Sequence, residues 1–350
     1  MSRTTRGFAL TALAVLTSAL ATACSSSPTA TATQTSAQTS AQKGDPASDV
    51  VINFGDQQQE LETLLNVSGV LQGAPYKVNF VEFDSGPLVD AGFAAHRIDV
   101  GSMGDLPASL AVKSGLPVQA VMVDKSIGAS EYLLAEPGIT SIAQLRGKPV
   151  AYTTGTAEQA FALRALKQGG LTQADVHQVD VTLEQLGTAL QSGAAVASVV
   201  DAEQKADYEL GHPGATVLAT IQTVTPPSYG YLLATTAALA DPAKRAAIEN
   251  LTKRIIEASD WQKSHQSQFI TDYYVDVEHQ TPQVAKLILA AGGTDTYIPI
   301  TAGVQSALQQ MVDLMASSGG LPASFSVAPL YSQSVAAWYN AVVAEVPQNG

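Results

Sequence analysis

The sequence predicts an α/β protein whose body consists of two lobes joined by a pair of crossing strands. Beginning at Val50, short apolar runs that suit buried strands alternate with segments whose leucines and alanines recur at helical spacing. This alternation favours a parallel sheet with helices on both faces. The tetrapeptide Tyr-Leu-Leu-Ala occurs at 132–135 and again at 231–234, each time between two runs of alternating elements. We therefore expect the chain to leave one lobe at the first copy and to return at the second.

The two copies are expected to run side by side as a hinge, because both are apolar and would be buried against each other. Hinge closure around a ligand is an established way for two lobes to switch between open and closed forms. An internal duplication and a chance repeat in a chain rich in Ala and Leu are the two alternatives.

The expected elements fall into two α/β runs and a helical C-terminal part. In the first lobe, strands are expected at 50–54, 77–83, 98–103 and 117–123, and helices from about 58 and at 87–97 and 106–115. In the second lobe, strands are expected at 148–154, 176–181, 194–200 and 215–221, and helices at 141–147, 156–170 and 183–193. From Asp241 the pattern is mostly helical. The predicted organisation is a signal peptide at 1–23, a linker at 24–49, lobe one at 50–131 and 235–350, and lobe two at 132–234 with the hinge strands.

The N-terminal segment has the layout of a secretory signal. Arg3 and Arg6 precede an apolar stretch that is too short and too rich in small residues for a membrane span. Cys24, the single cysteine of the chain, stands at the expected cleavage point in Leu-Ala-Thr-Ala-Cys. This position predicts bacterial lipoprotein processing, in which the thiol receives a diacylglycerol. An ordinary signal-peptidase site beside an incidental cysteine is the alternative.

The segment that follows Cys24 is expected to be a disordered, lipid-anchored linker. Residues 25–48 are almost wholly Ser, Thr, Ala and Gln, and such a composition cannot bury enough apolar surface to fold. The predicted location is the outer face of the cytoplasmic membrane, as a lipoprotein, or the periplasm. Since no cysteine follows Cys24, disulfides and thiol chemistry are excluded from the body.

Charge and residue patterning exclude several classes of function. The chain has 18 Lys and Arg against 31 Asp and Glu, a formal net charge of −13, which makes nucleic-acid binding improbable. The five histidines are scattered without metal-ligand spacing, and no nucleophile elbow or phosphate loop is present. We therefore expect no metal site, no cofactor and no catalytic residues, and a monomer that binds a small molecule.

Three strand-to-helix loops are the candidate binding residues. They contain Asp56 and Gln57 after the first strand, Gly104 and Asp105 after the third, and Thr154, Gly155 and Thr156 in the second lobe. In open parallel sheets ligands bind beyond the carboxyl ends of the strands, where helix N-termini offer free N–H groups. Each loop taken singly is also explained as an ordinary connection between a strand and a helix. Their occurrence in both lobes favours a shared cleft.

At these residues the sequence resembles the solute-binding proteins of ABC importers for aliphatic sulfonates, taurine and nitrate. The resemblance extends from about Ile52 to Ser332. It is carried by the blocks INFGDQ, VEFDSGPLVDAGFAAHRIDVGSMGDLPASLA, SIAQLRGKPVAYTTGTAEQAFALRALKQGGLT and YIPIT. It implies the two-lobed periplasmic-binding-protein-like fold of type II, with two crossing hinge strands, C-terminal helices and a ligand enclosed between the lobes. An ABC permease with its ATPase is the implied partner.

The resemblance also implies positions for the ligand contacts. Carried over residue by residue, they fall on Gln57, Gly104, Asp105, Thr154, Gly155, Thr156 and Tyr229. The sequence departs from the family pattern at two places, and each departure adds a carboxyl group. Many members have an aromatic-Asp-Pro-aromatic stretch where this chain has Val-Asp201-Ala-Glu203, and Asp56 stands where an aromatic residue is common.

These observations predict a binding protein that performs no chemistry on its solute. Helix N-termini favour an anionic or accepting group, whereas Asp56, Asp105, Asp201 and Glu203 favour an amine, and no Lys or Arg lies in the loops. A solute with both groups, such as taurine, satisfies both observations. The alternatives are an amine-bearing or neutral solute such as a thiamine-pyrimidine precursor, an enzyme on the same fold such as a thiamine-pyrimidine synthase, and a purely structural surface lipoprotein.

Overall fold

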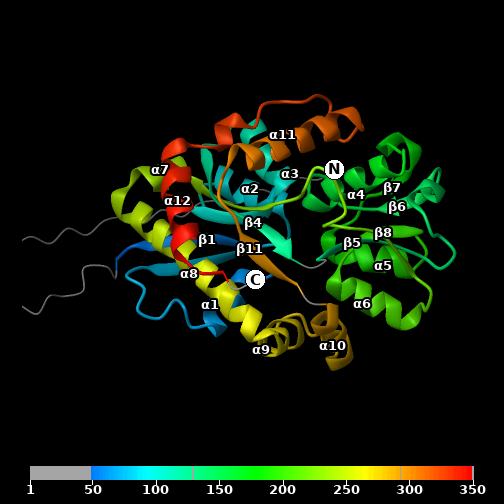
Figure 1. Cartoon of the computed structure of the whole chain (residues 1–350), viewed down its shortest axis with the longest axis horizontal. Coiled ribbons are helices and arrows are strands. Elements are labelled where there is room, and N and C mark those ends of the chain that lie inside the picture. The colour runs from blue at the N-terminus through cyan, green and yellow to red at the C-terminus, as the bar shows by residue number, and fades with distance from the viewer. Residues whose placement is uncertain (1–48, 128–129, 292, 349–350) are drawn as a thin grey trace, which may run out of the picture. The chain divides into compact units, whose positions relative to one another are not determined.

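The computed structural model describes residues 49–127, 130–291 and 293–348, whose helices and strands are built around two sheets (Figure 1). The expected signal peptide, Cys24 and the linker up to residue 48 lie outside the described residues. Within the described ranges, we find no helix with the length and apolarity needed to cross a membrane.

The first sheet has six strands in the order β11–β4–β10–β3–β1–β2. Their bounds are β1 Val51–Gln57, β2 Lys77–Phe83, β3 Val100–Gly104, β4 Val118–Ile127, β10 Gly230–Thr235 and β11 Thr294–Tyr297. β1 is parallel to β2 and β3, as expected from the alternation of strand and helix. β10 lies antiparallel between β3 and β4, and β11 is antiparallel to β4, so the prediction of a purely parallel sheet is wrong at these two strands.

The second sheet has five strands in the order β7–β6–β8–β5–β9. Their bounds are β5 Glu131–Ala135, β6 Pro149–Ala151, β7 His177–Val179, β8 Ala197–Asp201 and β9 Thr216–Thr220. β6 is parallel to β7 and β8, whereas β5 is antiparallel to its neighbours β8 and β9. Each sheet therefore combines a parallel part with one strand that enters it from the other sheet and runs in the opposite direction.

The two Tyr-Leu-Leu-Ala copies do not pair with each other, which corrects the predicted hinge. The first copy is in β5 of the second sheet and the second copy is in β10 of the first sheet. Both are buried because each strand has a neighbour on either side, and not because they cover one another. The chain passes between the sheets just before each copy, from β4 to β5 and from β9 to β10. Two crossing segments are therefore present, but they adjoin the repeated tetrapeptides.

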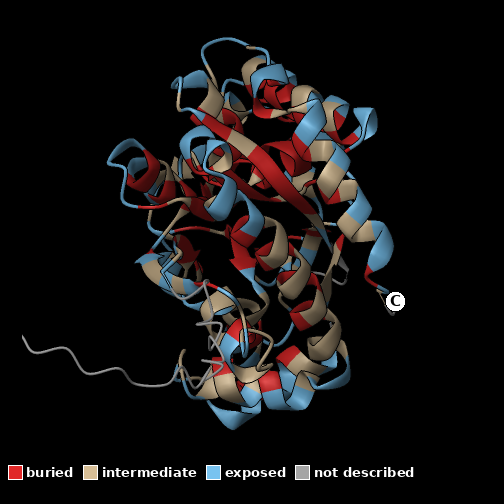
Figure 2. Cartoon of the chain, turned by 90° about the vertical axis from the view of Figure 1, so that its left-hand side faces the viewer, coloured by how far each residue is buried: buried red, intermediate tan, exposed pale blue. Residues whose placement is uncertain are grey.

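Helices surround the sheets and dominate the C-terminal part, as expected. The α-helices are α1 Glu60–Val67, α2 Gly86–Ala94, α3 Asp105–Lys113, α4 Ala157–Gln168, α5 Leu186–Gln191, α6 Ala202–Gly211, α7 Thr236–Ala240, α8 Pro242–Ser264, α9 Gln266–Ile270, α10 Pro282–Ala291, α11 Ala302–Ser317 and α12 Gln333–Glu345. The 3-10 helices are η1 Ile142–Leu145, η2 Gln173–Asp175, η3 Leu183–Gln185 and η5 Ala328–Leu330, and η4 Thr271–Val275 is a π-helix. Helix α6 and strand β11 were not expected from the sequence. Figure 2 shows buried residues along the strands and the inner faces of the helices.

The long helix α8 contributes residues to the candidate site described below. It begins at a strong N-terminal signal, in which Asp241 accepts hydrogen bonds from the backbone of Ala243 and Lys244 and Pro242 occupies the first turn. Ile248, Leu251 and Ile255 recur at helical spacing on its buried face. This packing holds the C-terminal end of α8, which carries Gln262, beside the candidate site.

Candidate functional site

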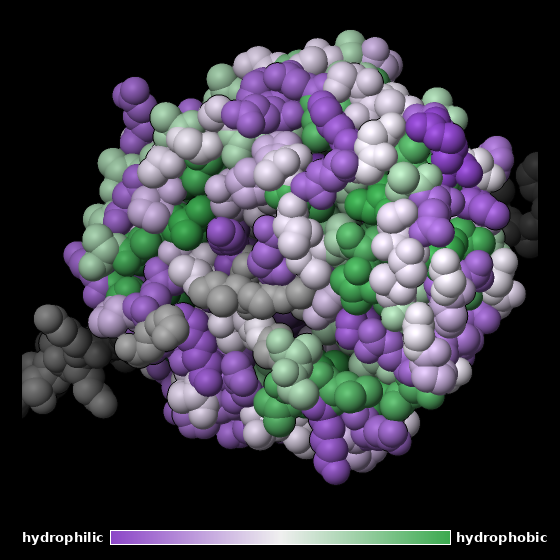
Figure 3. All heavy atoms as spheres, turned by 45° about the vertical axis from the view of Figure 1, so that its right-hand side comes forward, coloured by the Kyte–Doolittle hydropathy of each residue, from purple (hydrophilic) through white to green (hydrophobic). Residues whose placement is uncertain are grey.

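A cleft made of four adjoining hollows contains residues of both sheets and of the helices that follow them. Asp295 lines all four hollows and Glu60 lines three, so the hollows share their walls. The largest has a volume of about 410 Å³, and its lining includes residues of α1, β5, η3, β8, α6 and β11. In the space-filling view, hydrophilic residues border a hollow on the face shown (Figure 3).

Acidic side chains dominate the polar lining of the cleft. Ten lining residues carry a carboxyl group, namely Asp56, Glu60, Asp124, Glu131, Glu158, Glu184, Asp201, Glu203, Glu278 and Asp295. Of the described residues that line the four hollows, none is a Lys, Arg or His. The cleft therefore concentrates carboxyl groups, and its described lining contributes no basic side chain to pair with them.

The enclosure and crowding of these carboxyl groups raise their pKa values. Although the Glu60 side chain is solvent accessible, enclosure by the cleft walls raises its pKa to about 8, and repulsion by Asp295 adds to the shift. Desolvation raises the pKa of Glu203 to about 8, with further repulsion from Asp201. The pKa of Glu131 lies well above its ordinary value, because of burial and then because of the neighbouring Glu158. A cation in the cleft would stabilise the ionised form of all these groups.

The helix N-termini at the cleft already hold acidic residues of the chain itself. Glu60 is in the first turn of α1, Glu158 in that of α4 and Glu203 in that of α6. Asp201 caps α6 by accepting a hydrogen bond of 2.8 Å from the backbone of Gln204. A helix N-terminus attracts anions through its free N–H groups and partial positive charge, and a carboxylate in the first turn offsets that attraction. The arrangement therefore favours a cation over an anion.

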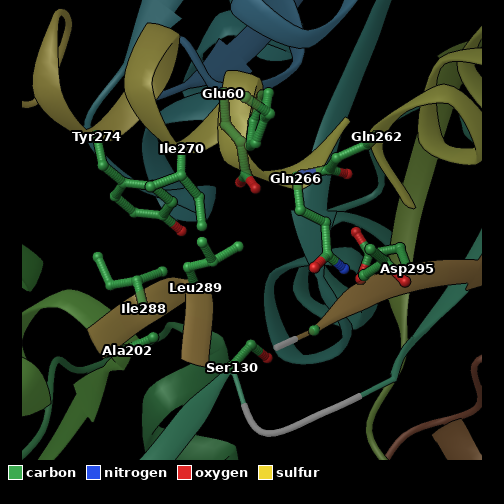
Figure 4. Close-up of a pocket in the computed structure, with 13 residues that line it drawn as sticks. Glu60, Ser130, Ala202, Gln262, Gln266, Ile270, Tyr274, Ile288, Leu289 and Asp295 are labelled. Carbon is green, nitrogen blue, oxygen red and sulfur yellow. The ribbon is translucent and has the colours of Figure 1, made fainter. Parts of the chain in front are cut away.

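One hollow combines this acidity with apolar and amide side chains. Figure 4 shows Glu60, Gln266 and Asp295 on one side of the hollow, with Tyr274 and Leu289 facing them. Amide groups can donate to a carboxylate or accept from an ammonium group. The apolar side chains provide a surface for the carbon skeleton of an organic solute.

Five of the nine predicted ligand residues lie on the cleft, in different ways. They are Asp56, Gln57, Gly104, Asp201 and Tyr229. The side chain of Gln57 donates to the carbonyl of Ser102 at 2.9 Å, which fixes the loop after β1. Asp56 is 1% exposed and accepts from the backbone of Gln57 at 2.9 Å and of Glu62 at 2.7 Å. Asp56 therefore acts as a structural cap of α1 in addition to bordering the cleft.

Gly104, at the end of β3, lies very close to the start of helix α4. A Cβ atom at Gly104 would lie 2.5 Å from the Cβ of Ala157, at the start of α4. No side chain fits there, so glycine permits the end of β3 to approach α4. Gly104 borders the cleft, and the structure shows a packing reason for a glycine at this position, while its contact with a ligand stays a prediction.

The other four predicted ligand residues use their polar groups elsewhere and are not among the lining residues. Asp105 forms a buried ion pair with Arg164 of α4. Thr154 binds Asp180 through its backbone N–H and its hydroxyl, each at 2.9 Å. The N–H of Gly155 donates to Gln159 at 2.9 Å, and the hydroxyl of Thr156 donates to a backbone carbonyl at 2.9 Å. Direct ligand contact by these four residues stays a prediction.

Several cleft residues were missed because the residues that they meet in the cleft are remote in sequence. Asp124 follows the apolar run of β4, and Glu131 directly precedes the first Tyr-Leu-Leu-Ala copy. An acidic residue directly after or before an apolar run is a usable signal, and both residues could have been found by it. Asp295 gave no such signal, because β11 is short and polar.

Comparison with known families identifies the chain. The family described as NMT1/THI5 like matches residues 77–265, which is more than half of the sequence. The chain belongs to this family. The solute-binding-protein resemblance predicted from the sequence is confirmed by relatives of known name.

Two similar proteins from Escherichia coli (strain K12) illustrate the relationship. One is named putative aliphatic sulfonates-binding protein and is 32% identical over 119 residues, 33% of this chain and 37% of the relative. The other is named taurine-binding periplasmic protein and is 26% identical over 116 residues, 33% of this chain and 36% of the relative. The chain thus matches little more than a third of the length of these two relatives.

Two solved structures confirm the fold of this NMT1/THI5-like chain. The periplasmic aliphatic sulphonate binding protein SsuA from Escherichia coli has a TM-score of 0.72 at 24% identity, covering 82% of this chain and 93% of that one. The alkanesulfonate-binding protein SsuA from Xanthomonas axonopodis pv. citri, bound to MOPS, also has a TM-score of 0.72, at 22% identity, covering 82% of this chain and 99% of that one. The predicted periplasmic-binding-protein-like fold is therefore confirmed.

Proposed function

We propose that this chain is the exported solute-binding component of an ABC importer, and that its cleft takes a small organic solute carrying a protonated amine. The relatives named as sulfonate- and taurine-binding proteins support the first part. The observation that carries the second part is the cleft itself, with ten carboxyl groups and no basic side chain among its described lining residues. The protein binds its solute without transforming it and hands it to a permease driven by an ATPase.

The proposed mechanism is closure of two lobes around the solute. Lobe one is built on the first sheet, up to β4 and again from β10 onward, and lobe two is built on the second sheet, from β5 to β9. The boundary predicted at 234/235 therefore moves to the start of β10, and the segments before β5 and β10 act as the hinge. Carboxyl groups on both sheets would approach one another on closure, so the empty closed form is disfavoured by like-charge repulsion. A cation that neutralises them stabilises the closed form selectively, which is the differential affinity that a population shift requires.

The acidic lining of the cleft supports one of the solute classes suggested by the relatives' names over the other. A sulfonate without an amine brings another negative charge into an acidic cleft. Taurine carries an ammonium group that carboxylates bind through charge-assisted hydrogen bonds, although its sulfonate then needs a place at the rim. We therefore favour an amine-bearing solute, with taurine included, over an aliphatic sulfonate that lacks the amine.

Calorimetry with matched small molecules tests this proposal. Taurine, ethylamine and ethanesulfonate differ only in which of the two charged groups they carry. Ethylamine and taurine are expected to bind at least about tenfold more tightly than ethanesulfonate, because a charge-assisted hydrogen bond contributes about 1.5–3 kcal/mol. Glu203→Gln should weaken the two amines, whereas Glu249→Gln, in an exposed ion pair of α8, should change neither. Tighter binding of ethanesulfonate than of ethylamine would overturn the amine as the recognised group.

The proposal includes a lipid anchor on Cys24, which lies outside the described residues. Metabolic labelling with a fatty-acid analogue in a bacterial host is expected to tag the wild-type chain and to leave Cys24→Ser unlabelled, since the acylated thiol is then absent. Membrane fractionation of the same two proteins provides an independent readout. Equal labelling of both would remove the anchor and leave an ordinary exported protein.

A further inference from the structure

Six of the ten carboxyl groups of the cleft form two sets. The strand set comprises Asp124 of β4, Glu131 of β5 and Asp295 of β11, which together line a hollow of about 110 Å³. The α6 set comprises Asp201, Glu203 and Glu278, which line the hollow of about 410 Å³ and do not line the smaller one. Because Glu131 and Asp295 line both hollows, the two sets border one continuous space.

The strand set contains an acidic oxygen that the protein leaves without a partner. Oε2 of Glu131 is buried and accepts no hydrogen bond from any described residue. The carboxyl group of Asp124 lies against β10, where a Cβ on Gly230 would come within 2.3 Å of its Oδ2. Burial, and then repulsion by Asp295, holds the pKa of Asp124 well above its ordinary value. A buried acceptor of this kind costs free energy unless a donor from a ligand or water satisfies it.

The α6 set is partly satisfied by the protein but has no basic partner in the described lining. Asp201 caps α6, and Glu203 accepts a hydrogen bond from the side chain of Gln280. The carboxyl of Glu278 is close enough to Asp201 for repulsion to contribute to its raised pKa, after burial. Tyr274 lines the same hollow and offers an aromatic face, which suits an organic cation.

The larger hollow also has apolar side chains in its lining. Leu183, Leu186, Val199 and Val200 contribute to its lining. A short hydrocarbon chain can pack against such side chains, whereas a bare metal ion cannot use them. Across the described residues, no three acidic side chains or histidines come close enough together to hold a metal ion.

We infer that the solute carries two cationic nitrogen atoms, one held by the strand set and one by the α6 set, and is therefore a linear diamine or oligoamine. This inference rests on the proposed function and narrows its solute class. A solute with one ammonium group satisfies only one set and leaves the other repelled. A diamine neutralises both sets and places its methylene groups against the apolar side chains.

Calorimetry with 1-aminobutane, 1,4-diaminobutane and 1,5-diaminopentane tests the inference on the purified protein. The diamines are expected to bind about ten to a hundred times more tightly than 1-aminobutane, because the second ammonium adds a charge-assisted hydrogen bond. Asp124→Asn and Glu203→Gln should each reduce diamine affinity about tenfold or more and narrow the difference from the monoamine. Glu249→Gln on α8 serves as the matched control and should leave all three affinities unchanged.

The outcomes separate this inference from the proposed function. Equal affinity for 1-aminobutane and 1,4-diaminobutane overturns the two-site solute while leaving an amine-binding cleft. Binding of ethanesulfonate but of none of the amines overturns both. Tight binding of Ca²⁺ or Zn²⁺ alone, lost in Asp124→Asn or Glu203→Gln, identifies a metal site and also overturns the inference.

Discussion

Replacing Arg164 with methionine is expected to lower the free energy of unfolding by about 3–5 kcal/mol, the typical cost of removing one partner of a buried ion pair. The Arg164 side chain is 0% exposed and pairs with Asp105, which is 1% exposed. Ser228 donates to the same carboxylate at 3.1 Å. Without the guanidinium, this hydroxyl is left facing a buried and uncompensated charge. Urea denaturation followed by circular dichroism measures the loss.

A matched pair on the surface provides the control for this measurement. Arg245 and Glu249 form an exposed ion pair on α8, so Arg245→Met is expected to cost about 0–1 kcal/mol. The double variant Arg164→Met with Asp105→Leu should regain much of the lost stability, because the buried charge has then also been removed. Similar losses for Arg164→Met and Arg245→Met would mean that the buried pair contributes little.

This ion pair illustrates what the sequence predicted and what it did not. Asp105 was predicted as a ligand residue because it follows a strand and begins a helix, and both features are confirmed. The sequence could not reveal that α4 brings Arg164 to the same place, since the two residues are 59 positions apart. A polar residue at a strand end is consistent with ligand contact and with a buried ion pair alike.

Local patterns predicted the elements better than their partners. The strand at 77–83 has the bounds expected, because its apolar residues are clearly delimited. The two Tyr-Leu-Leu-Ala copies were correctly expected to be buried and extended, but an apolar run carries no information about which strand lies beside it. Pairing is decided by the path of the whole chain, which sets β5 between β8 and β9 and β10 between β3 and β4.

The acidity of the cleft was predicted only in part for the same reason. Asp56 was recognised because a loop was expected after the first strand, and Asp201 because it stands where the resembled family has an aromatic-Asp-Pro-aromatic stretch. Asp124 and Asp295 meet only because β11 pairs with β4, and this pairing joins segments about 170 residues apart. The charge of the cleft is thus a consequence of topology, and no single stretch of sequence contains it.

Raising the pH from 4.5 to 8 is expected to destabilise the ligand-free protein. The pKa of Glu203 is near its ordinary value of 4.5 in the unfolded chain but about 8 in the cleft, where desolvation and then Asp201, Glu278 and Asp207 oppose its charge. Between these two values the folded protein holds a proton that the unfolded chain has released. Stability is therefore greatest at the acid end of this window and falls as the pH rises through it. Glu60 acts in the same direction, with a pKa of about 8.

Thermal unfolding of the ligand-free protein across this pH range measures the effect. Glu203→Gln should flatten the decline in stability, since the amide has no proton to lose, while Glu249→Gln should reproduce the wild-type slope.

The affinity for an amine is expected to respond to pH in the opposite direction. An amine stays protonated up to a pH of about 10 and favours the ionised carboxyl groups, so its affinity rises as the pH rises from 4.5 to 8. Each carboxyl that must ionise on binding contributes up to about tenfold in affinity per pH unit below its pKa. Calorimetry in buffers of different ionisation enthalpy should detect the released protons. If the stability rose with pH and the affinity for the amine did not, these carboxyl groups would be paired within the protein and would not be available to bind a cation.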